Sequence, residues 1–376
     1  MIERLIETFS TLNDPRCEGK VAHRLMDILV IAVCAVIACA ESFEDIALYG
    51  RSKEAWLRNF LTLPNGIPSH DTFRRVFMLI DADAFEERFS AWVQGIVELE
   101  KQEVIAIDGK TLRHSFDRKR EKAALHLVSA WASQQRLVLG QRQVDGKSNE
   151  ITAIPELLDL LDLKHTLVTI DAMGCQKAIA QQIIDRGADY LLGLKANQGR
   201  AYVAVQTHFD SLCFQRSATL RPIHDAFDDT HGRLVRRRVF ISSEAARLPE
   251  LAPWANLRTV LAVESIRSIN GKNTVDTEIR YFISSSTANA SLLAQAIRQH
   301  WSIENNLHWV LDVNFHEDDS RLRHPDATRN MALLRKIAIN LIAQDRSVKI
   351  SLRAKRKRAA WDNEYMKQLL FNCFVR

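Results

Sequence analysis

Three carboxylates in this chain stand where they could hold metal ions. Asp108 and Asp171 each follow a short apolar run rich in β-branched residues, and Glu304 lies in the sequence His-Trp-Ser-Ile-Glu-Asn. Mg²⁺ and Mn²⁺ prefer carboxylate oxygens, and two such ions about 3.5 to 4 Å apart stabilise both the attacking and the leaving oxygen of a phosphoryl displacement. The trio therefore predicts a two-metal phosphodiester site, with all three carboxylates as catalytic residues and metal ligands.

The two aspartates are expected at one edge of a sheet. A β-branched run that ends in Asp is typical of a buried strand, and open α/β sheets bind ligands beyond the carboxyl ends of their strands. We therefore predict that one strand ends at Asp108 and its neighbour at Asp171. Each carboxylate alone could be a turn former, a helix cap or a surface charge. Together they favour a functional site, because Gly-Lys-Thr follows Asp108 and Trp, His and Asn surround Glu304.

Two lysines are candidates for binding substrate phosphate. Lys195 follows the strand-like run 190–194, and Lys110 lies two residues after Asp108. At the edge that carries the aspartates, either ammonium could act as a point charge on a phosphate. The alternative is a solvated lysine beside a turn, which is a weaker explanation for Lys195 than for Lys110.

The segment that carries Glu304 is expected to be helical. Four side chains recur there at helical spacing, namely Trp301, Asn305, His308 and Asp312. Trp301 and Asn305 could hold a splayed nucleotide by stacking and hydrogen bonding, although core packing is the commoner role of such a tryptophan. His300 is a further substrate-binding candidate. His300 and His308 could also be metal ligands, but a zinc site is disfavoured because no third His or Cys lies nearby. The acidic Asp312, Glu317 and Asp318 would either add charge to the cation site or cap a turn.

The composition is that of a soluble globular protein. With 376 residues, 47% hydrophobic and 26% charged, the chain is long enough for two or three domains. The net charge of +5 is only mildly basic and is weak evidence for nucleic acid. Six basic residues and no acid lie between 349 and 358, after a basic series from 321 to 336. Such a run is usually a solvated face or tail, but it could bind phosphate.

The cysteines and the longest apolar run indicate a cytoplasmic protein. The six cysteines form no Cys-x-x-Cys pair, which suits reduced thiols rather than zinc or disulfides. The apolar run 28–40 has 13 residues between Asp27 and Glu41, whereas a bilayer span needs about 20. We therefore expect a buried core helix and no membrane partner.

The order of predicted elements is that of a ribonuclease-H-like sheet. Residues 1–95 show helical spacing throughout, and from residue 104 the pattern changes to α/β, with a hairpin over 124–144, a helix at 150–161 and alternating strands and helices to about 197. Strands are expected at 233–241, 258–266 and 274–283, the last two joined through Asn270-Gly271. We predict a helical N-terminal domain at 1–95, a catalytic core at 100–216, a β-rich insertion at 217–287, and a C-terminal part of the core with a basic tail at 288–376.

These motifs carry a resemblance to a known family. Ile-Asp-Gly-Lys at Asp108, Thr-Ile-Asp-Ala at Asp171 and the Glu304 segment resemble the Asp-Asp-Glu triad of insertion-sequence transposases. The stretches 69–75 and 307–318 narrow the resemblance to the H-repeat-associated transposases of bacteria, within the transposase 11 family, and it covers essentially the whole chain. One departure concerns the Tyr-x2-Arg-x3-Glu-x6-Lys signature of related enzymes, because Ile297, His300, Glu304 and Leu311 stand at its four positions.

The resemblance implies a DNA-mediated transposition enzyme that cleaves element ends and joins them to target DNA. It further implies a ribonuclease-H-like core, two Mg²⁺ or Mn²⁺ ions, double-stranded DNA as partner, a homodimer on DNA, and association with the nucleoid when DNA is bound. Two alternatives stay open. One is a nuclease that cuts without joining, and the other is a catalytically silent remnant that only binds DNA.

Overall fold

The computed structural model describes residues 2–17, 19, 21–116, 123–144, 149–214, 220–230, 233–269, 275–287 and 289–371. Two compact units are present. The first comprises Met1–Glu98, Gly109–Leu161 and Glu304–Arg376, and the second Leu99–Asp108 and Asp162–Ile303. The helical first 98 residues thus share a unit with later segments, and the four predicted domain boundaries stay a prediction. No helix in the described part of the chain is long and apolar enough to cross a membrane.

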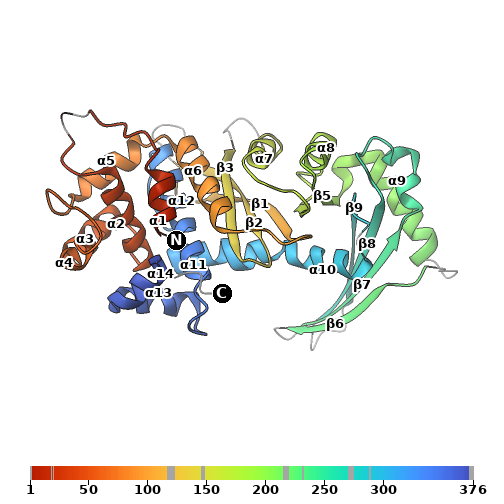
Figure 1. Ribbon diagram of the computed structural model, residues 1–376. Coiled ribbons are helices and arrows are strands. Elements are labelled where there is room, and N and C mark those ends of the chain that lie inside the picture. Colours follow the sequence, from red (N-terminus) through yellow and green to blue (C-terminus); the bar gives the residue numbers. More distant parts are fainter. Residues whose placement is uncertain are drawn as a thin grey trace. The chain divides into compact units, whose positions relative to one another are not determined.

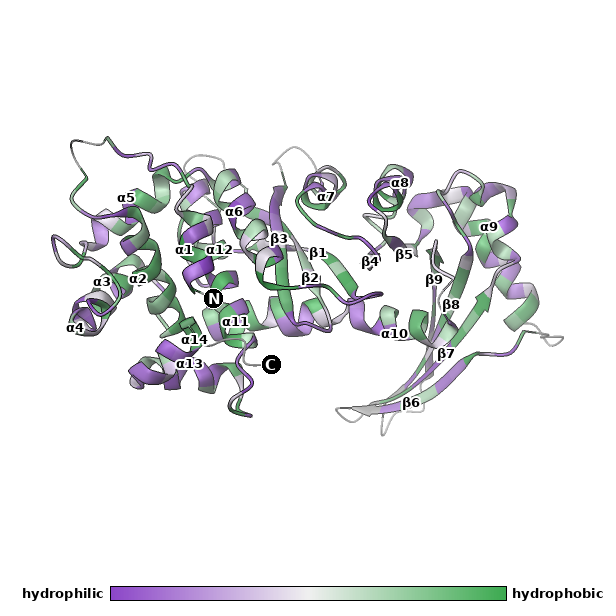
Figure 2. Ribbon diagram, in the orientation of Figure 1, coloured by the Kyte–Doolittle hydropathy of each residue, from purple (hydrophilic) through white to green (hydrophobic). Residues whose placement is uncertain are grey.

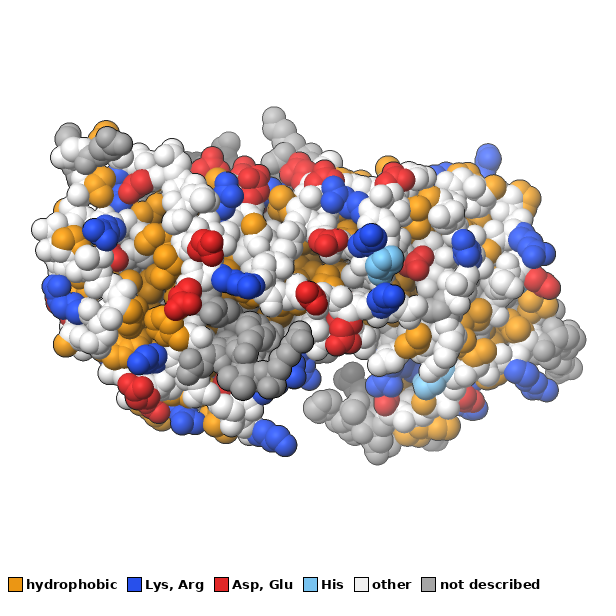
Figure 3. All heavy atoms as spheres, viewed as in Figure 1, with side chains coloured by type: hydrophobic (Ala, Val, Ile, Leu, Met, Phe, Trp, Pro, Cys, Tyr) orange, Lys and Arg blue, Asp and Glu red, His pale blue; other side chains and the backbone are white. Residues whose placement is uncertain are grey.

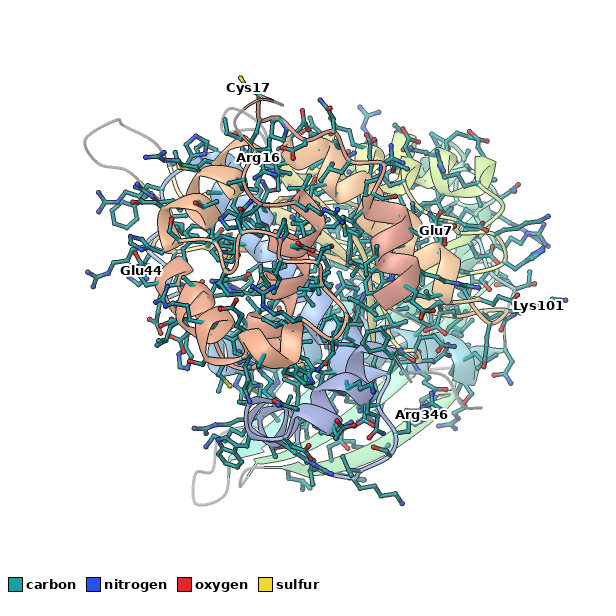
Figure 4. The ribbon with its side chains drawn as sticks, turned by 60° about the vertical axis from the view of Figure 1, so that its left-hand side comes forward. Glu7, Arg16, Cys17, Glu44, Lys101 and Arg346 are labelled. Atoms are coloured by element: carbon teal, nitrogen blue, oxygen red, sulfur yellow. The ribbon has the colours of Figure 1, made fainter. Side chains whose placement is uncertain are left out.

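The first unit is largely helical. Its helices are α1 (Ile2–Phe9), α2 (Leu25–Ile37), α3 (Phe43–Ser52), α4 (Glu54–Leu57), α5 (His70–Leu79), α6 (Ala82–Ile96), α7 (Glu150–Asp159), α11 (Trp309–Phe315), α12 (Pro325–Ala343), α13 (Leu352–Trp361) and α14 (Asn363–Phe371). Local sequence sets their ends, since Ser42 caps α3 through a capping box and Ser69 caps α5. On α1 and α3, Glu7 and Glu44 lie on the exposed faces (Figure 4).

Helix α2 confirms the prediction of a buried core helix at the apolar run. Every residue from Ile28 to Ile37 is at most 2% exposed, and the helix is hydrophobic on all sides (Figure 2). It packs against α12, which also contacts α5 and α6 (Figure 1). A helix that is apolar all round needs neighbours on every side. The cluster of helices around α12 supplies them.

Two antiparallel strands of the first unit confirm the predicted hairpin. They are β2 (Leu125–Ala132) and β3 (Leu137–Val144), and β2 lies next to β1 (Val104–Leu112) in the strand order. Helices α6, α7 and α12 pack on β3. The prediction that the first strand ends at Asp108 is wrong, because β1 continues for four more residues to Leu112. The buried Leu112 anchors that extension in an apolar cluster with Leu127 and Ala332, so Asp108 lies within the strand.

The second unit is built on a mixed sheet. Its strands are the first half of β1, β4 (Leu167–Ile170), β5 (Asp189–Leu194), β6 (His224–Thr230), β7 (Arg233–Ser242), β8 (Thr259–Ile269) and β9 (Val275–Ser284). They follow the order β1-β4-β5-β9-β8-β7-β6, with β1, β4 and β5 parallel and the other pairings antiparallel. The helices are α8 (Lys177–Asp185), α9 (Gly199–Phe209) and α10 (Ala290–His300). The chain therefore has the expected mixed α/β architecture.

The β-rich segment extends this sheet instead of standing apart from it. Strand β9 pairs directly with β5, with Leu192 opposite Ile283. Strand β6 was not predicted, because His-Asp-Ala-Phe-Asp-Asp-Thr has little apolar character, and it forms through its pairing with β7. The predicted Asn270-Gly271 turn between β8 and β9 lies outside the described residues.

The core of the second unit fixes α10 on the sheet. Leu293 and Ile297 of α10 belong to an apolar cluster with Val104 of β1, Leu167 of β4 and Leu191 of β5. Leu293 is fully buried, and such burial of a leucine contributes about 1.5 to 3 kcal/mol. This packing determines which face of α10 is left for solvent.

Candidate active site

The two aspartates lie at the same level of neighbouring parallel strands, Asp108 within β1 and Asp171 directly after β4. Ile107 of β1 is in register with Ile170 of β4, and Asp108 and Asp171 are the next residues. Neighbouring strands lie about 4.8 Å apart, so the register brings the two carboxylates to adjacent positions of the second unit. Asp108 is partly buried and Asp171 is exposed.

The turn after β4 orients Asp171. Its Oδ1 accepts hydrogen bonds from the backbone N–H groups of Met173 (2.9 Å) and Gly174 (3.4 Å). Gly193 of β5 lies directly behind this turn, and a Cβ there would come within 3.2 Å of the backbone nitrogen of Ala172. The side chain of Asn197 donates to the carbonyl of Ala172 at 2.6 Å. The turn is therefore held from both sides.

Glu304 begins a π-helical segment and not a regular helix as predicted. Helix α10 ends at His300, and Glu304–His308 winds as a π-helix before α11 begins at Trp309. Because a π-helix has more residues per turn than an α-helix, the side chains from Trp301 to Asp312 do not share one face in the way that α-helical spacing predicts. Isolated π-helical turns are frequent at functional sites. Glu304 itself is exposed.

A cavity of about 320 Å³ adjoins Asp171 in the second unit. Four of the site residues predicted from the sequence line it, namely Asp171, Lys195, His300 and Trp301. Arg280 lines it as well. The Arg280 guanidinium lies over the Trp301 ring, 5.3 Å from its centroid. Two hydrogen bonds from Arg280 to Glu278 fix that guanidinium and lower the pKa of the Glu278 carboxyl. The cavity thus combines an aromatic ring with cations beside a carboxylate.

His300 is held as a neutral imidazole at the wall of this cavity. Burial lowers its pKa to about 4, against the opposing influence of Asp171 and of Thr169. The Nδ1 atom lies 3.0 Å from the Thr169 hydroxyl oxygen. At neutral pH His300 therefore brings hydrogen-bonding capacity and no positive charge, unlike the arginine that stands at this position of the related signature.

Lys110 is surrounded by carboxylates of its own unit. Its Nζ lies 2.7 Å from Asp312 Oδ1, 2.9 Å from Asp318 Oδ1 and 3.3 Å from Glu317 Oε2. Burial alone would lower the pKa of Lys110, but the carboxylates outweigh it and raise that pKa. Burial raises the pKa of Asp312, and the neighbouring Asp318 and Glu317 carboxylates raise it further, against the opposing influence of the Lys110 ammonium. Asp312, Glu317 and Asp318 thus bind Lys110 in an ion cluster. The two roles expected for them, in the cation site or as turn caps, stay predictions.

The basic C-terminal run is a folded helix and not a tail. All of its cations except Lys349 lie in α13, where the Lys355 ammonium is 3.2 Å from Asp345 Oδ2. Arg356 donates to the carbonyl of Val36 at 2.9 Å and stacks on the Phe315 ring. Two of the six cations are therefore buried and bound within the protein. On the face shown in Figure 3, Lys and Arg are interspersed with Asp and Glu.

Charged residues of α12 also turn inward, which sequence reasoning missed. Arg329 and Arg142 both bind the buried Glu86 at 2.8 Å. Lys336 is buried and donates to Gln141 Oε1 at 2.6 Å, and burial lowers its pKa to about 8. The cations of α12, Arg329, Arg335 and Lys336, stand at uneven intervals among apolar residues, so no periodic pattern in the sequence indicates that they are buried.

The described cysteines agree with reduced thiols. Cys34, Cys175 and Cys213 are buried, Cys17 and Cys39 are exposed, and all five are free. Burial raises the pKa of Cys34 to about 12, so this thiol is unreactive at neutral pH. Among the described residues, no three His, Cys, Asp or Glu side chains are already arranged as a metal site.

Family models match almost the whole chain. The model described as "Transposase DDE domain" matches residues 99–341, and the one described as "DDE_Tnp_1-associated" matches residues 6–93. Among solved structures, a piggyBac transposase synaptic complex with hairpin DNA covers 98% of this chain and 79% of its own at a TM-score of 0.45 and 14% identity. That likeness is too distant to support an inference.

Two curated relatives from Escherichia coli align over nearly their full lengths. "Putative transposase YncI" of strain O157:H7 is 42% identical over 99% of this chain and 95% of its own. "H repeat-associated putative transposase YhhI" of strain K12 is 40% identical over 98% of both chains. With these relatives and the matched model, the chain belongs to the Transposase DDE domain family, among the H repeat-associated transposases.

Proposed function

We propose that this protein is a DDE transposase that cleaves the ends of a mobile element and joins them to target DNA. The observation that carries the proposal is the register of β1 and β4, which gives Asp108 and Asp171 adjacent positions on parallel strands. Glu304, at the start of the π-helical segment, is the third member of the triad. The fold that we propose for this chemistry is a ribonuclease-H-like core.

The donor set fits Mg²⁺ or Mn²⁺. All three candidate ligands are carboxylates, which these hard cations prefer, and Asp171 already has its Oδ1 engaged by backbone N–H groups. Asp108, Asp171 and Glu304 would hold two ions. When bound, these ions supply Lewis-acid stabilisation of the attacking and leaving oxygens of the phosphodiester.

The protein's own groups bind and orient the reactants. In the first step a water oxygen attacks the phosphorus at an element end, and the bond to the 3′ oxygen breaks, which leaves a 3′-hydroxyl and a 5′-phosphate. In the second step that 3′-hydroxyl attacks a target phosphodiester, and the target's 3′ oxygen leaves. No covalent bond to a side chain is required. The two aspartates and Glu304 orient the oxygens that react.

The cavity beside Asp171 is proposed to take a nucleotide. Trp301 offers a stacking surface, Lys195 a charge for phosphate, and the neutral His300 a hydrogen-bonding edge. Asn305 follows in the π-helical segment as a further substrate contact. Lys110 is also proposed as a phosphate contact, although three carboxylates already bind its ammonium. Double-stranded DNA is the proposed partner, and a homodimer is proposed on DNA because two ends must be paired.

The decisive experiment uses the DNA that flanks the reading frame. Inverted repeats found there would be cloned as element ends and incubated with the full-length protein and Mg²⁺ or Mn²⁺. Asp108→Asn, Asp171→Asn and Glu304→Gln should each abolish cleavage while duplex binding persists. Asp185→Asn, at an exposed position of α8, is the matched control and should cleave normally. Cleavage by the Asp108→Asn protein at the wild-type rate would overturn the proposal.

A strand-transfer assay separates the proposal from its alternatives. Joined products from a pre-cleaved 3′-hydroxyl end support a transposase. Cleavage without joined products would identify a nuclease, and binding without either product would identify a silent remnant.

A further inference from the structure

A second cavity of the second unit lies on the solvent side of α10. It has a volume of about 440 Å³, and its lining comes from α10, from Ser302 after that helix, and from His224 at the start of β6. The α10 residues that line it include Ser291, Gln295, Arg298 and Gln299. We call this cavity the α10 groove.

The polar face of α10 follows from helical spacing. Positions 291, 295, 298, 299 and 302 recur at intervals of three or four residues, so they share one face. The opposite face carries Leu293 and Ile297, which pack on the sheet. The helix therefore presents hydroxyl, amide and guanidinium donors to the groove along its whole length. No Asp or Glu occurs in α10 itself.

The electrostatics of the groove favour an anion. Among the described residues that line it none is acidic, and Arg298 is a lining cation with 56% of its side chain exposed. Asp228 of β6 is the nearby carboxylate, and two arginines bind it, Arg237 by a short contact and Arg298 at 3.3 Å. The local balance of these groups is positive. Neutral donors around a single cation match the alternating phosphates and sugars of a nucleic-acid backbone.

We propose that the α10 groove binds the sugar-phosphate backbone of duplex DNA next to the reacting end. The inference rests on the proposed function for its choice of DNA, and it adds a contact surface apart from the cavity beside Asp171. Both cavities use α10, one on each side, and the chain runs from Ser302 to Glu304 within two residues. A strand bound along α10 would thus contact a segment that directly precedes Glu304 in the sequence.

The test measures binding of a fluorescein-labelled duplex of about 30 base pairs and arbitrary sequence to the full-length protein over a range of KCl concentrations. Loss of one phosphate contact reduces the slope of log K against log salt by about 1. Arg298→Ala should weaken binding and lower the slope by that amount. Arg247→Ala removes the same charge from an exposed site in the same unit, so it is the matched control and should keep the wild-type slope.

A gain-of-charge variant guards against misfolding as an explanation. Gln295→Lys adds a cation to the groove and should tighten binding and raise the slope by about 1, whereas Gln181→Lys on the exposed face of α8 makes the same change in net charge elsewhere. Equal slopes for Arg298→Ala, Gln295→Lys and their controls would overturn the groove and leave the proposed transposase activity intact. Failure of the wild-type protein to bind any duplex would overturn both.

Discussion

Lys110 of β1 donates a hydrogen bond to Asp318, 208 residues later in the chain, with Nζ 2.9 Å from Oδ1. Through Glu317 the cluster continues to Arg335 of α12, at 3.7 Å. The strand that carries the Gly-Lys-Thr motif and the segment that follows α11 are thus joined by a charge cluster that is buried at Glu317 and half-buried at Lys110 and Asp318. These ion pairs fix Lys110 to the acidic residues Glu317 and Asp318 within the first unit. The pairing accounts for the presence of these charged residues without a bound ligand.

Lys110→Met should therefore destabilise the protein strongly. Removal of the ammonium takes the 2.7 Å ion pair from the half-buried Asp312 and leaves the buried Glu317 with Arg335 at 3.7 Å. Loss of one partner of a buried ion pair typically costs about 3 to 5 kcal/mol. Urea unfolding of the full-length chain should show a lower midpoint with a similar slope. Lys195→Met, at an exposed position, is the control and should shift the midpoint little. Equal stability of the two variants would show that the carboxylates do not depend on Lys110.

Glu86→Gln should also destabilise the first unit. Glu86 is 1% exposed and accepts hydrogen bonds from Arg142, Arg329 and Gln141, so its neutralisation leaves two buried guanidinium groups short of a counterion, at about 3 to 5 kcal/mol. The neighbouring Glu87→Gln provides the control, because Glu87 is 53% exposed and its contact with Arg142, at 3.6 Å, is longer than that of Glu86. The midpoint temperature of thermal unfolding should be far lower for Glu86→Gln than for Glu87→Gln. The reverse order would contradict the network of ion pairs around Glu86.

The neutral state of His300 predicts a loss of stability in acid. The pKa of His300 is about 4 in the folded chain, compared with the ordinary value of 6.5 for histidine, so the unfolded chain binds more protons between these two pH values. The free energy of unfolding therefore falls as pH falls through that window, by up to ~1.4 kcal/mol per pH unit, and the effect is absent above it.

His300→Asn should make this acid dependence shallower. Urea titrations at about pH 7, 5.5 and 4.5 would compare it with wild type and with Gln299→Asn, a substitution of the preceding residue that leaves the imidazole in place. An unchanged dependence in His300→Asn would mean that His300 is not the group that loses its neutral state.

Trp301→Ala should weaken binding of a single-stranded element end. Stacking of a base on an aromatic side chain contributes about 1 to 3 kcal/mol, so the dissociation constant should rise by about 5- to 150-fold, with a smaller rise for Trp301→Phe. Trp361→Ala tests a tryptophan that is 78% exposed on α13 and should have little effect. Fluorescence anisotropy measures all three. Identical losses for Trp301→Ala and Trp361→Ala would indicate that the cavity beside Asp171 holds no base.

Local patterns in the sequence determined most of the elements that carry the site. The β-branched runs before Asp108 and Asp171 are strands, the hairpin lies where it was expected, and the apolar run 28–40 is a buried helix as far as Ile37. These features follow from the period of side chains along one segment, which the sequence displays directly. The motifs also sufficed to identify the family.

Tertiary structure alone decided how charges are paired and where the segments end. The continuation of β1 past Asp108, the formation of the polar β6 and the joining of β9 to β5 all depend on a neighbouring strand. Likewise, only the folded structure shows that Lys110 and cations of α12 and α13 bind buried acidic residues. Such pairings depend on packing between residues far apart in the chain, because burial makes an unpaired charge costly and no local pattern encodes its partner.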